Sequence, residues 1–285
     1  MATDWSRLGG VAPDALVKAR SLAHHAAQWP TKAARANLAA VPDDSHSSLV
    51  WGAGLAAFLS QPLATKNGAI RIGVGIADLR LMIVRGSAAG ASFALDGRSN
   101  AEAGTWIDAA LRAEGLAPAS VVKLPYEVPD HAVARGAQYG ASGEAAALAE
   151  LARWFGAAAE ALDDVSARFR DLRPGPSPVL CWPHHFDIAT VIELGAGQGE
   201  SARSVGIGLS PGDEFYAQPY WYVSPSPKLD AASLPKAPLS GHWHTQGFLA
   251  AVATGADTLK LGDRRRELVA FIIEAVEIGR ARLGA

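Results

Sequence analysis

The sequence predicts an α+β protein with mainly antiparallel sheet and flanking helices. Two observations predict this class: strand-like segments follow one another in groups instead of alternating with helices, and helical segments bound each group. The order is helix, strands, helix and then the same again, with a join near residue 140. We therefore expect two halves, residues 1–140 and 141–285, packed as one globular unit. An internal duplication of a helix-strands-helix unit would give this order.

The first half opens with an amphipathic helix from Pro13, which Pro30 is expected to kink or break. The helix is expected to resume over residues 31–38. Residues 70–76 alternate apolar and non-apolar side chains, and a two-residue link joins them to the apolar run 79–84. This pattern predicts an antiparallel hairpin with one covered face. Further strand-like text lies at residues 48–63 and 92–95.

A second helix follows, and a long connection separates it from the second half. Ser99 and Glu102 form a capping box, in which each side chain satisfies a free backbone N–H of the other residue, and the helix is expected to run to Glu114. Residues 116–142 contain three prolines and scattered glycine, which is typical of a connection. One strand is expected within it, over residues 121–124.

The second half begins with a long helix, because apolar residues recur three and four positions apart. This stripe consists of Leu148, Leu151, Phe155, Ala158, Leu162, Val165, Phe169 and Leu172. Strand-like text returns at residues 178–182, 186–194, 204–209, 220–224 and 248–254. A closing helix is expected over about 261–283.

Composition excludes several classes of function. The 285 residues include 26 Lys and Arg against 28 Asp and Glu, a net charge of -2, so we expect neither a nucleic acid nor an anionic membrane as partner. A small-molecule ligand is the expected partner. The single cysteine, Cys181, cannot form an internal disulfide, and the amino-terminal residues lack the basic and apolar stretches of an export signal. No apolar run approaches the ~20 residues that span a bilayer. We expect a cytoplasmic protein.

Three familiar motifs fail on physical grounds. Residues 208–212 match the GxSxG string of serine hydrolases, but Pro211 has no backbone N–H to donate to an oxyanion. The glycine-rich residues 195–200 follow a strand, yet strand-like text resumes after them, so a hairpin loop is predicted instead of a phosphate-binding loop. Arg264, Arg265 and Arg266 are predicted to form the solvated face of a helix.

The second half concentrates histidine and aspartate. On an extended strand His185 and Asp187 point to one side, and His242 and His244 point together from another strand. An HxH pair with a further His and a carboxylate is a ligand set for zinc or iron, so these four residues are the predicted metal ligands. Two alternatives stay open: a metal-free polar pocket and structural hydrogen bonding.

Further candidate ligand-binding residues lie on one strand and on the first helix. Tyr220 and Tyr222 share one strand face, so their hydroxyls could line a pocket, although such rings are usually core residues. Polar residues of the first helix form a stripe at spacings near three and four. The candidates in this stripe are His24, Gln28, Lys32 and Arg35. Such a stripe usually faces water; turned toward a ligand, its two cationic residues would hold an anionic group.

The order of these blocks resembles a bacterial family of uncharacterised proteins, catalogued as a domain of unknown function. The resemblance covers nearly the whole chain and includes the His24/Gln28 pair, SFAL, KLPYEVPD and the Trp-x-x-x-Phe-Asp-x-Ala strand from Trp182 to Ala189. The GLSPGD, PYWYVSP and GHWHT blocks resemble one branch of that family. The resemblance implies an architecture, and Asp187 as the shared polar group, but no reaction.

The leading hypothesis is a small-molecule pocket lined by these histidines, Asp187 and the tyrosines. In an enzyme, Asp187 and His185 would supply general acid–base catalysis, since a carboxylate-oriented imidazole titrates near neutral pH. A bound metal would instead activate water or substrate as a Lewis acid. The alternative is a non-catalytic binding or assembly protein in which the histidines are structural.

Overall fold

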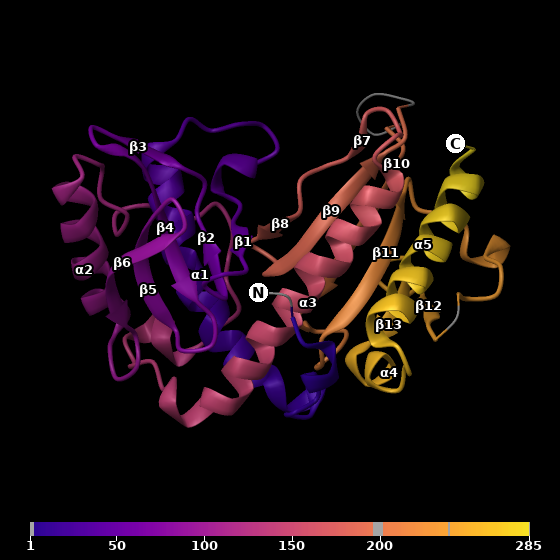
Figure 1. Ribbon diagram of the computed structural model, residues 1–285, viewed down its shortest axis with the longest axis horizontal. Helices are drawn as coiled ribbons and strands as arrows, with labels where there is room; N and C mark the ends of the chain where they lie inside the picture. Colours follow the sequence, from indigo (N-terminus) through magenta and orange to yellow (C-terminus); the bar gives the residue numbers. More distant parts are fainter. Residues whose placement is uncertain (1–2, 196–201, 239, 285) are drawn as a thin grey trace. The chain divides into compact units, whose positions relative to one another are not determined.

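The computed structural model describes residues 3–195, 202–238 and 240–284 (Figure 1). It has an α+β fold with two antiparallel sheets and flanking helices, as predicted. The chain forms two compact units. The first unit comprises Ala15–Arg153 and Leu180–Phe186, and the second comprises Ala2–Asp14, Trp154–Val179 and Asp187–Ala285. The division thus falls inside a helix instead of near residue 140, and the amino-terminal segment belongs with the second unit.

The helices and strands follow the predicted order closely. In the first unit they are α1 (Val17–Asn37), β1 (Val50–Gly52), β2 (Ala57–Leu59), β3 (Leu63–Thr65), β4 (Gly68–Gly75), β5 (Arg80–Arg85), β6 (Ala88–Ala94), α2 (Asn100–Ala113) and β8 (Leu180–Trp182). Helix α3 (Ala145–Phe169) begins in the first unit and continues into the second. The second unit also contains β7 (Gly175–Pro176), β9 (Asp187–Glu193), β10 (Ser204–Ser210), β11 (Tyr220–Ser226), β12 (His242–His244), β13 (Ala250–Thr254), α4 (Gly255–Leu259) and α5 (Arg264–Leu283).

The sheet of the first unit runs β1-β2-β4-β5-β6, with β3 beside β4. The predicted β4–β5 hairpin is confirmed, but both of its faces are covered, because all four residues from Leu81 to Val84 are buried. The non-apolar positions of β4 include Gly73 and Gly75, which are small and not hydrophilic. Met82 packs over both of them. Alternation with glycine therefore does not indicate a solvated face.

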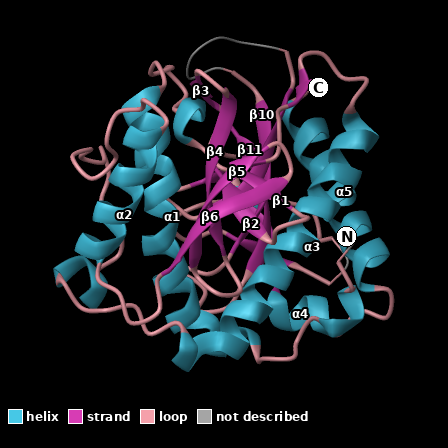
Figure 2. Ribbon diagram, turned by 60° about the vertical axis from the view of Figure 1, so that its left-hand side comes forward, coloured by secondary structure: helices cyan, strands magenta, loops and turns pink. Residues whose placement is uncertain are grey.

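Helix α1 continues through Pro30, so the predicted break is wrong. Proline removes one backbone hydrogen bond, at a cost of about 3 kcal/mol in a helix interior. Tertiary packing outweighs this cost, since Trp29, Ala33 and Ala34 around the proline are buried. The helix packs on β4 and lies beside α2 (Figure 2).

The second helix begins as predicted, and the connection after it is irregular. Both hydrogen bonds of the Ser99–Glu102 capping box are present. The strand expected over residues 121–124 is not formed. Asp108 on α2 instead holds the start of this connection, because its carboxylate accepts the backbone N–H groups of Ala119 (2.8 Å) and Ser120 (3.0 Å).

The sheet of the second unit runs β12-β13-β11-β10-β9-β7 (Figure 1). Strands β9 and β10 pair antiparallel, while most of the predicted glycine-rich hairpin loop, residues 196–201, lies outside the described residues. Helix α5 packs on β10 and β11. The arginines at its start are not merely solvated: Arg264 donates to the carbonyls of Trp5 and Leu8, both at 2.9 Å, and Arg265 pairs with Asp164 of α3 at 2.8 Å. Within the described residues no helix is long and apolar enough to cross a membrane.

Candidate functional site

One face of the second sheet carries most of the predicted site residues of this unit. Directly paired residues of neighbouring strands project to the same side of a sheet. The register makes one such row of Ala189, Gly208, Tyr222, Val252 and His242. Asp187, Tyr220 and His244 lie two positions from members of this row and so point the same way. We call this side the polar face. The predictions that Tyr220 and Tyr222 share one strand face, and that His242 and His244 do so on another strand, are confirmed.

Tyr222 reaches across β10 to Asp187. Its hydroxyl donates a short hydrogen bond to Asp187 Oδ2, and the aspartate is only 8% exposed. Gly208, between the two strands, makes this possible: a Cβ there would lie 2.5 Å from the Tyr222 hydroxyl and 2.7 Å from the Ile188 carbonyl oxygen. Glycine at this position is therefore required for the Tyr222–Asp187 pair.

Tyr220 is held by a second carboxylate. Its hydroxyl donates to Asp213 Oδ2 at 2.5 Å, while Asp213 Oδ1 accepts the backbone N–H groups of Phe215 (2.8 Å) and Tyr216 (3.1 Å). Burial, together with this hydrogen bond, raises the pKa of Tyr220 well above its usual value. Asp213 thus holds the turn that follows it and also fixes the ring of Tyr220.

Tyr216 joins the two histidines of β12. Its hydroxyl oxygen lies 2.8 Å from His242 Nε2 and 2.9 Å from His244 Nδ1. The other ring nitrogen of His244, Nε2, lies 2.5 Å from the Gln246 carbonyl oxygen, which can only accept a hydrogen bond. Neutral His244 therefore carries its proton on Nε2 and accepts from Tyr216 through Nδ1.

These constraints fix the direction of the whole chain of hydrogen bonds. Because Tyr216 donates its hydroxyl proton to His244, the phenol oxygen must accept from His242 Nε2–H. The Nδ1 atom of neutral His242 is then a lone-pair acceptor, on a residue that is exposed. Burial, followed by the charge of Asp213, raises the pKa of Tyr216, which keeps its hydroxyl protonated at neutral pH. The Tyr216–His242–His244 group is hereafter the Tyr–His cluster.

Aromatic rings border this cluster. Phe248 stacks on His244, with ring centres 4.0 Å apart and an angle of 23° between the planes. Phe215, 45% exposed, meets both rings edge-on. A Cβ at Gly247 would lie 2.8 Å from the Phe215 ring, so glycine allows this ring to lie there. The cluster therefore combines proton donors and acceptors with an apolar surface.

His185 does not lie on the strand that was expected to carry it. Residues 183–186 form a turn, and strand β9 begins at Asp187. Phe186 has a φ of 59°, in the left-handed region, so the alternation of strand side chains does not extend back to His185. The strand argument that placed His185 and Asp187 on one face is therefore wrong.

In the first unit, His24 and Gln28 bind this turn. His24 Nε2 lies 2.8 Å from the Pro183 carbonyl oxygen, and Gln28 Nε2 donates to the same oxygen at 3.0 Å. The His24 ring stacks on Phe186, with ring centres 5.0 Å apart. Burial lowers the pKa of His24 to about 4, so the ring is neutral at physiological pH. The Gln28 Oε1 atom accepts the Tyr126 hydroxyl at 2.9 Å.

The two cationic residues of the predicted stripe differ from each other. Arg35 forms an ion pair with Asp44 at 2.8 Å. Lys32 is half-buried, with its ammonium nitrogen 5.2 Å from the centre of the Trp29 ring. The stripe thus does not face water as a whole: His24 and Gln28 are buried, and Gln28 and Lys32 line one cavity.

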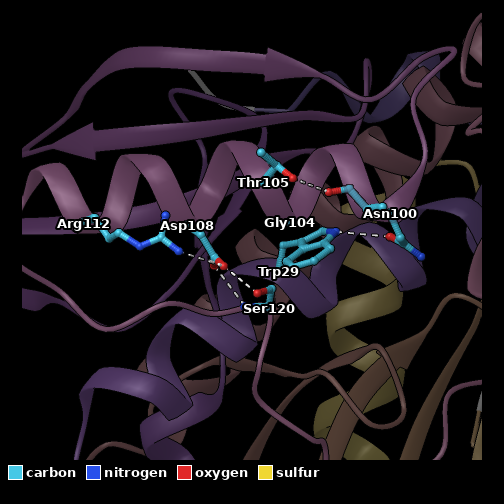
Figure 3. A pocket seen from close by; sticks show the side chains of 8 residues that line it. Trp29, Asn100, Gly104, Thr105, Asp108, Arg112 and Ser120 are labelled. Carbon is cyan, nitrogen blue, oxygen red and sulfur yellow. Dashed lines mark hydrogen bonds and ion pairs between the residues drawn. The ribbon is translucent and has the colours of Figure 1, made fainter.

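Two cavities of the first unit share Trp29 and Asn100 as part of their walls. Figure 3 shows the first, of about 410 Å³, where the Trp29 ring lies beneath Gly104 and donates from Nε1 to Asn100 Oδ1 at 3.3 Å. Asp108 in this cavity is already bonded to the following connection. The second cavity, of about 390 Å³, contains Lys32.

The described residues do not support the predicted zinc or iron site. No three His, Cys, Asp or Glu side chains among them are grouped as ligands of one ion. His242 and His244 instead turn a nitrogen each toward Tyr216, and Asp187 accepts from Tyr222. A metal site formed by His185, Asp187, His242 and His244 therefore stays a prediction.

Sequence reasoning missed Tyr216 and Gly208 as site residues. Tyr216 lies in an irregular turn, where no periodicity indicates the direction of a side chain. Gly208 was considered only within the GxSxG string. Its signal was a glycine inside a strand, which often marks a close approach of another group.

Comparison with known proteins gives no match, whether to a family model, to a characterised protein or to a solved structure. The resemblance to an uncharacterised bacterial family therefore stays a prediction.

Proposed function

We propose that this protein binds a small polar molecule beside the Tyr–His cluster and exchanges a proton with it through His242. The observation that carries the proposal is the position of the Tyr216 hydroxyl between two imidazole nitrogens, with the Gln246 carbonyl fixing the direction of every bond. An exposed imidazole in one defined tautomer is suited to act as a general base.

The hydrogen bonds of His242 indicate which of its ring nitrogens would take a proton. Neutral His242 would take a proton from the bound molecule on Nδ1, since its Nε2–H is engaged with Tyr216. The resulting imidazolium would be stabilised by the Tyr216 oxygen, which already accepts from Nε2. The proton-transfer role thus passes from His185, predicted from the sequence, to His242, while Asp187 positions Tyr222.

The rings beside the cluster indicate the kind of molecule that would bind. Phe215 and Phe248 offer apolar contact next to His244, which Tyr216 links to His242. The formal charge of the chain is near zero, which favours no strongly charged polymer. A small molecule with an acidic proton and an apolar body fits the surface beside the Tyr–His cluster best.

Histidine NMR tests the proposal. In protein labelled with ¹⁵N-histidine we expect the Nε2–H tautomer for both His242 and His244, and small carboxylic acids, phenols and amides added in turn should include compounds that perturb His242 Nδ1. Tyr216→Phe should abolish the tautomer preference of His242. Tyr220→Phe, which removes a neighbouring hydroxyl that does not touch an imidazole, should leave it intact.

Two results would contradict the proposal. An Nδ1–H tautomer at His244 would reverse the deduced chain of hydrogen bonds. Failure of every compound to perturb His242, with the tautomers as expected, would favour the non-catalytic alternative in which the cluster is structural.

A further inference from the structure

The cavity around Lys32 in the first unit has the size of a ligand site. Its volume is about 390 Å³, and small-molecule sites usually measure about 300–1,000 Å³. Helix α1 contributes Trp29 and Lys32 to its wall, and the connection after α2 contributes Leu124 and Val128. Four of its lining residues are apolar and give the apolar contact that sites for organic ligands offer, and the other four are polar: Trp29, Leu124, Val128 and Ala134 against His25, Gln28, Lys32 and Asn100.

The uncharged polar side chains of this wall already have partners. Gln28 bonds to the carbonyls of His24 and Pro183 and to the Tyr126 hydroxyl. Asn100 accepts from the Tyr139 hydroxyl at 2.8 Å and donates to the Val133 carbonyl at 2.9 Å.

His25, on the same wall, is also engaged. Its Nε2 atom lies 2.9 Å from the Pro129 carbonyl oxygen. Burial lowers its pKa, so this ring adds no positive charge at neutral pH. The wall therefore contains a fixed, satisfied polar frame.

Lys32 is the exception. Within residues 3–195, 202–238 and 240–284 no carboxylate lies within ion-pair distance of its ammonium, and no hydrogen bond to it is formed. Its contact with the Trp29 ring is a cation–π interaction, which compensates only part of the lost hydration. A half-buried ammonium without a carboxylate partner has unused capacity to bind an anion.

We propose that Lys32 binds the carboxylate of a small organic acid whose apolar body fills the cavity against Trp29, Leu124 and Val128. Among the described residues that line the cavity, Lys32 alone carries a fixed positive charge, and a single ammonium matches a monoanion better than a phosphate dianion. The proposal concerns a site in the first unit and does not depend on the Tyr–His cluster.

Calorimetry with a matched pair of ligands tests this site. The probes are 3-phenylpropionate and its neutral isostere 3-phenylpropanamide, with hexanoate as an aliphatic acid. We expect both acids to bind the full-length protein and the amide to bind roughly tenfold to a hundredfold more weakly, the range typical of a charged hydrogen bond.

Protein variants locate the binding. Lys32→Met should weaken binding of the acids by about the same factor and leave the amide unaffected. The control is Lys18→Met, which removes an exposed lysine of the same helix that does not line the cavity, and binding should be unchanged. The proposal is overturned if neither acid binds, if acid and amide bind wild-type protein equally, or if Lys18→Met causes the same loss. The ligand comparison needs only wild-type protein, so it decides even if Lys32→Met does not fold.

Discussion

We compare two polar centres: the polar face of the second unit and the cavity around Lys32 in the first unit. They differ in how completely their polar and charged side chains are paired with one another. On the polar face of the second unit, each of the three tyrosine hydroxyls ends on a carboxylate or an imidazole. In the cavity of the first unit, the amide and imidazole groups are hydrogen-bonded. Within the part of the chain that the structure describes, the ammonium of Lys32 has no carboxylate or hydrogen-bond partner and contacts the Trp29 ring. A satisfied network fixes the positions and protonation states of its members, whereas an unsatisfied charge retains affinity for a ligand.

Helix α1 carries both kinds of polar group, the paired and the unpaired, within three turns. His24 and Gln28 are buried and bonded to the turn before β9, and Lys32 projects from the same helix into a cavity. Substitutions should therefore have opposite effects on stability along one helix: loss of a satisfied group destabilises the fold, and loss of the unsatisfied charge does not. The following predictions test this difference.

The largest expected effect is a loss of stability in acid that depends on His24. Its pKa is lowered by burial from 6.5 to about 4, so the unfolded chain binds a proton at a higher pH than the folded chain does. This contribution is fully present above pH 6.5, falls as the pH decreases, and is lost at about pH 4. The total loss in the free energy of unfolding over this pH range is about 3 kcal/mol. Urea unfolding of wild type and His24→Gln from pH 7.5 to 4 should show the variant losing less stability.

A similar loss is expected from Gly208→Ala. The new methyl group would overlap both the Tyr222 hydroxyl and the Ile188 carbonyl, of which only the side chain can move. We expect a decrease of about 3 kcal/mol in the free energy of unfolding, typical of overpacking. Gly206→Ala is the control, because a Cβ there would lie no closer than 3.8 Å to its nearest neighbour, the Ser224 carbonyl oxygen. Both variants are compared by thermal unfolding. Equal destabilisation by the two substitutions would show that replacing any glycine of this strand has this effect, and that the close approach of Tyr222 to Gly208 is not its cause.

Tyr222→Phe should lower the free energy of unfolding by less, about 2 kcal/mol, because it leaves the buried Asp187 carboxylate without the hydroxyl donor of this pair. Tyr220→Phe provides the comparison. Asp213 keeps two backbone donors after that change and is exposed, so we expect a loss below about 1 kcal/mol. Chemical denaturation of both variants at pH 7.5 measures the difference, and the reverse order would contradict the assigned network.

The sequence predicted the fold class, the order of helices and strands, and which residues share one face of a regular strand. The shared faces of Tyr220 with Tyr222 and of His242 with His244 follow from strand periodicity alone. His185 was misplaced because a single left-handed residue, Phe186, ends that periodicity. Tyr216 was missed because its direction depends on the turn that Asp213 fixes, a contact that no local pattern reveals.

The smallest expected effect has the opposite sign. Lys32→Met replaces a half-buried ammonium, whose pKa burial lowers, by an apolar side chain of similar length. Without ligand, we expect the free energy of unfolding to rise by less than about 1 kcal/mol, since water still screens much of the charge. Lys18→Met, at an exposed position of α1, should leave it unchanged. The two are compared by urea unfolding at pH 7.5. A loss of stability in Lys32→Met alone would mean that the cation–π contact with Trp29 outweighs the desolvation of the ammonium, and the contrast between the two polar centres would no longer hold.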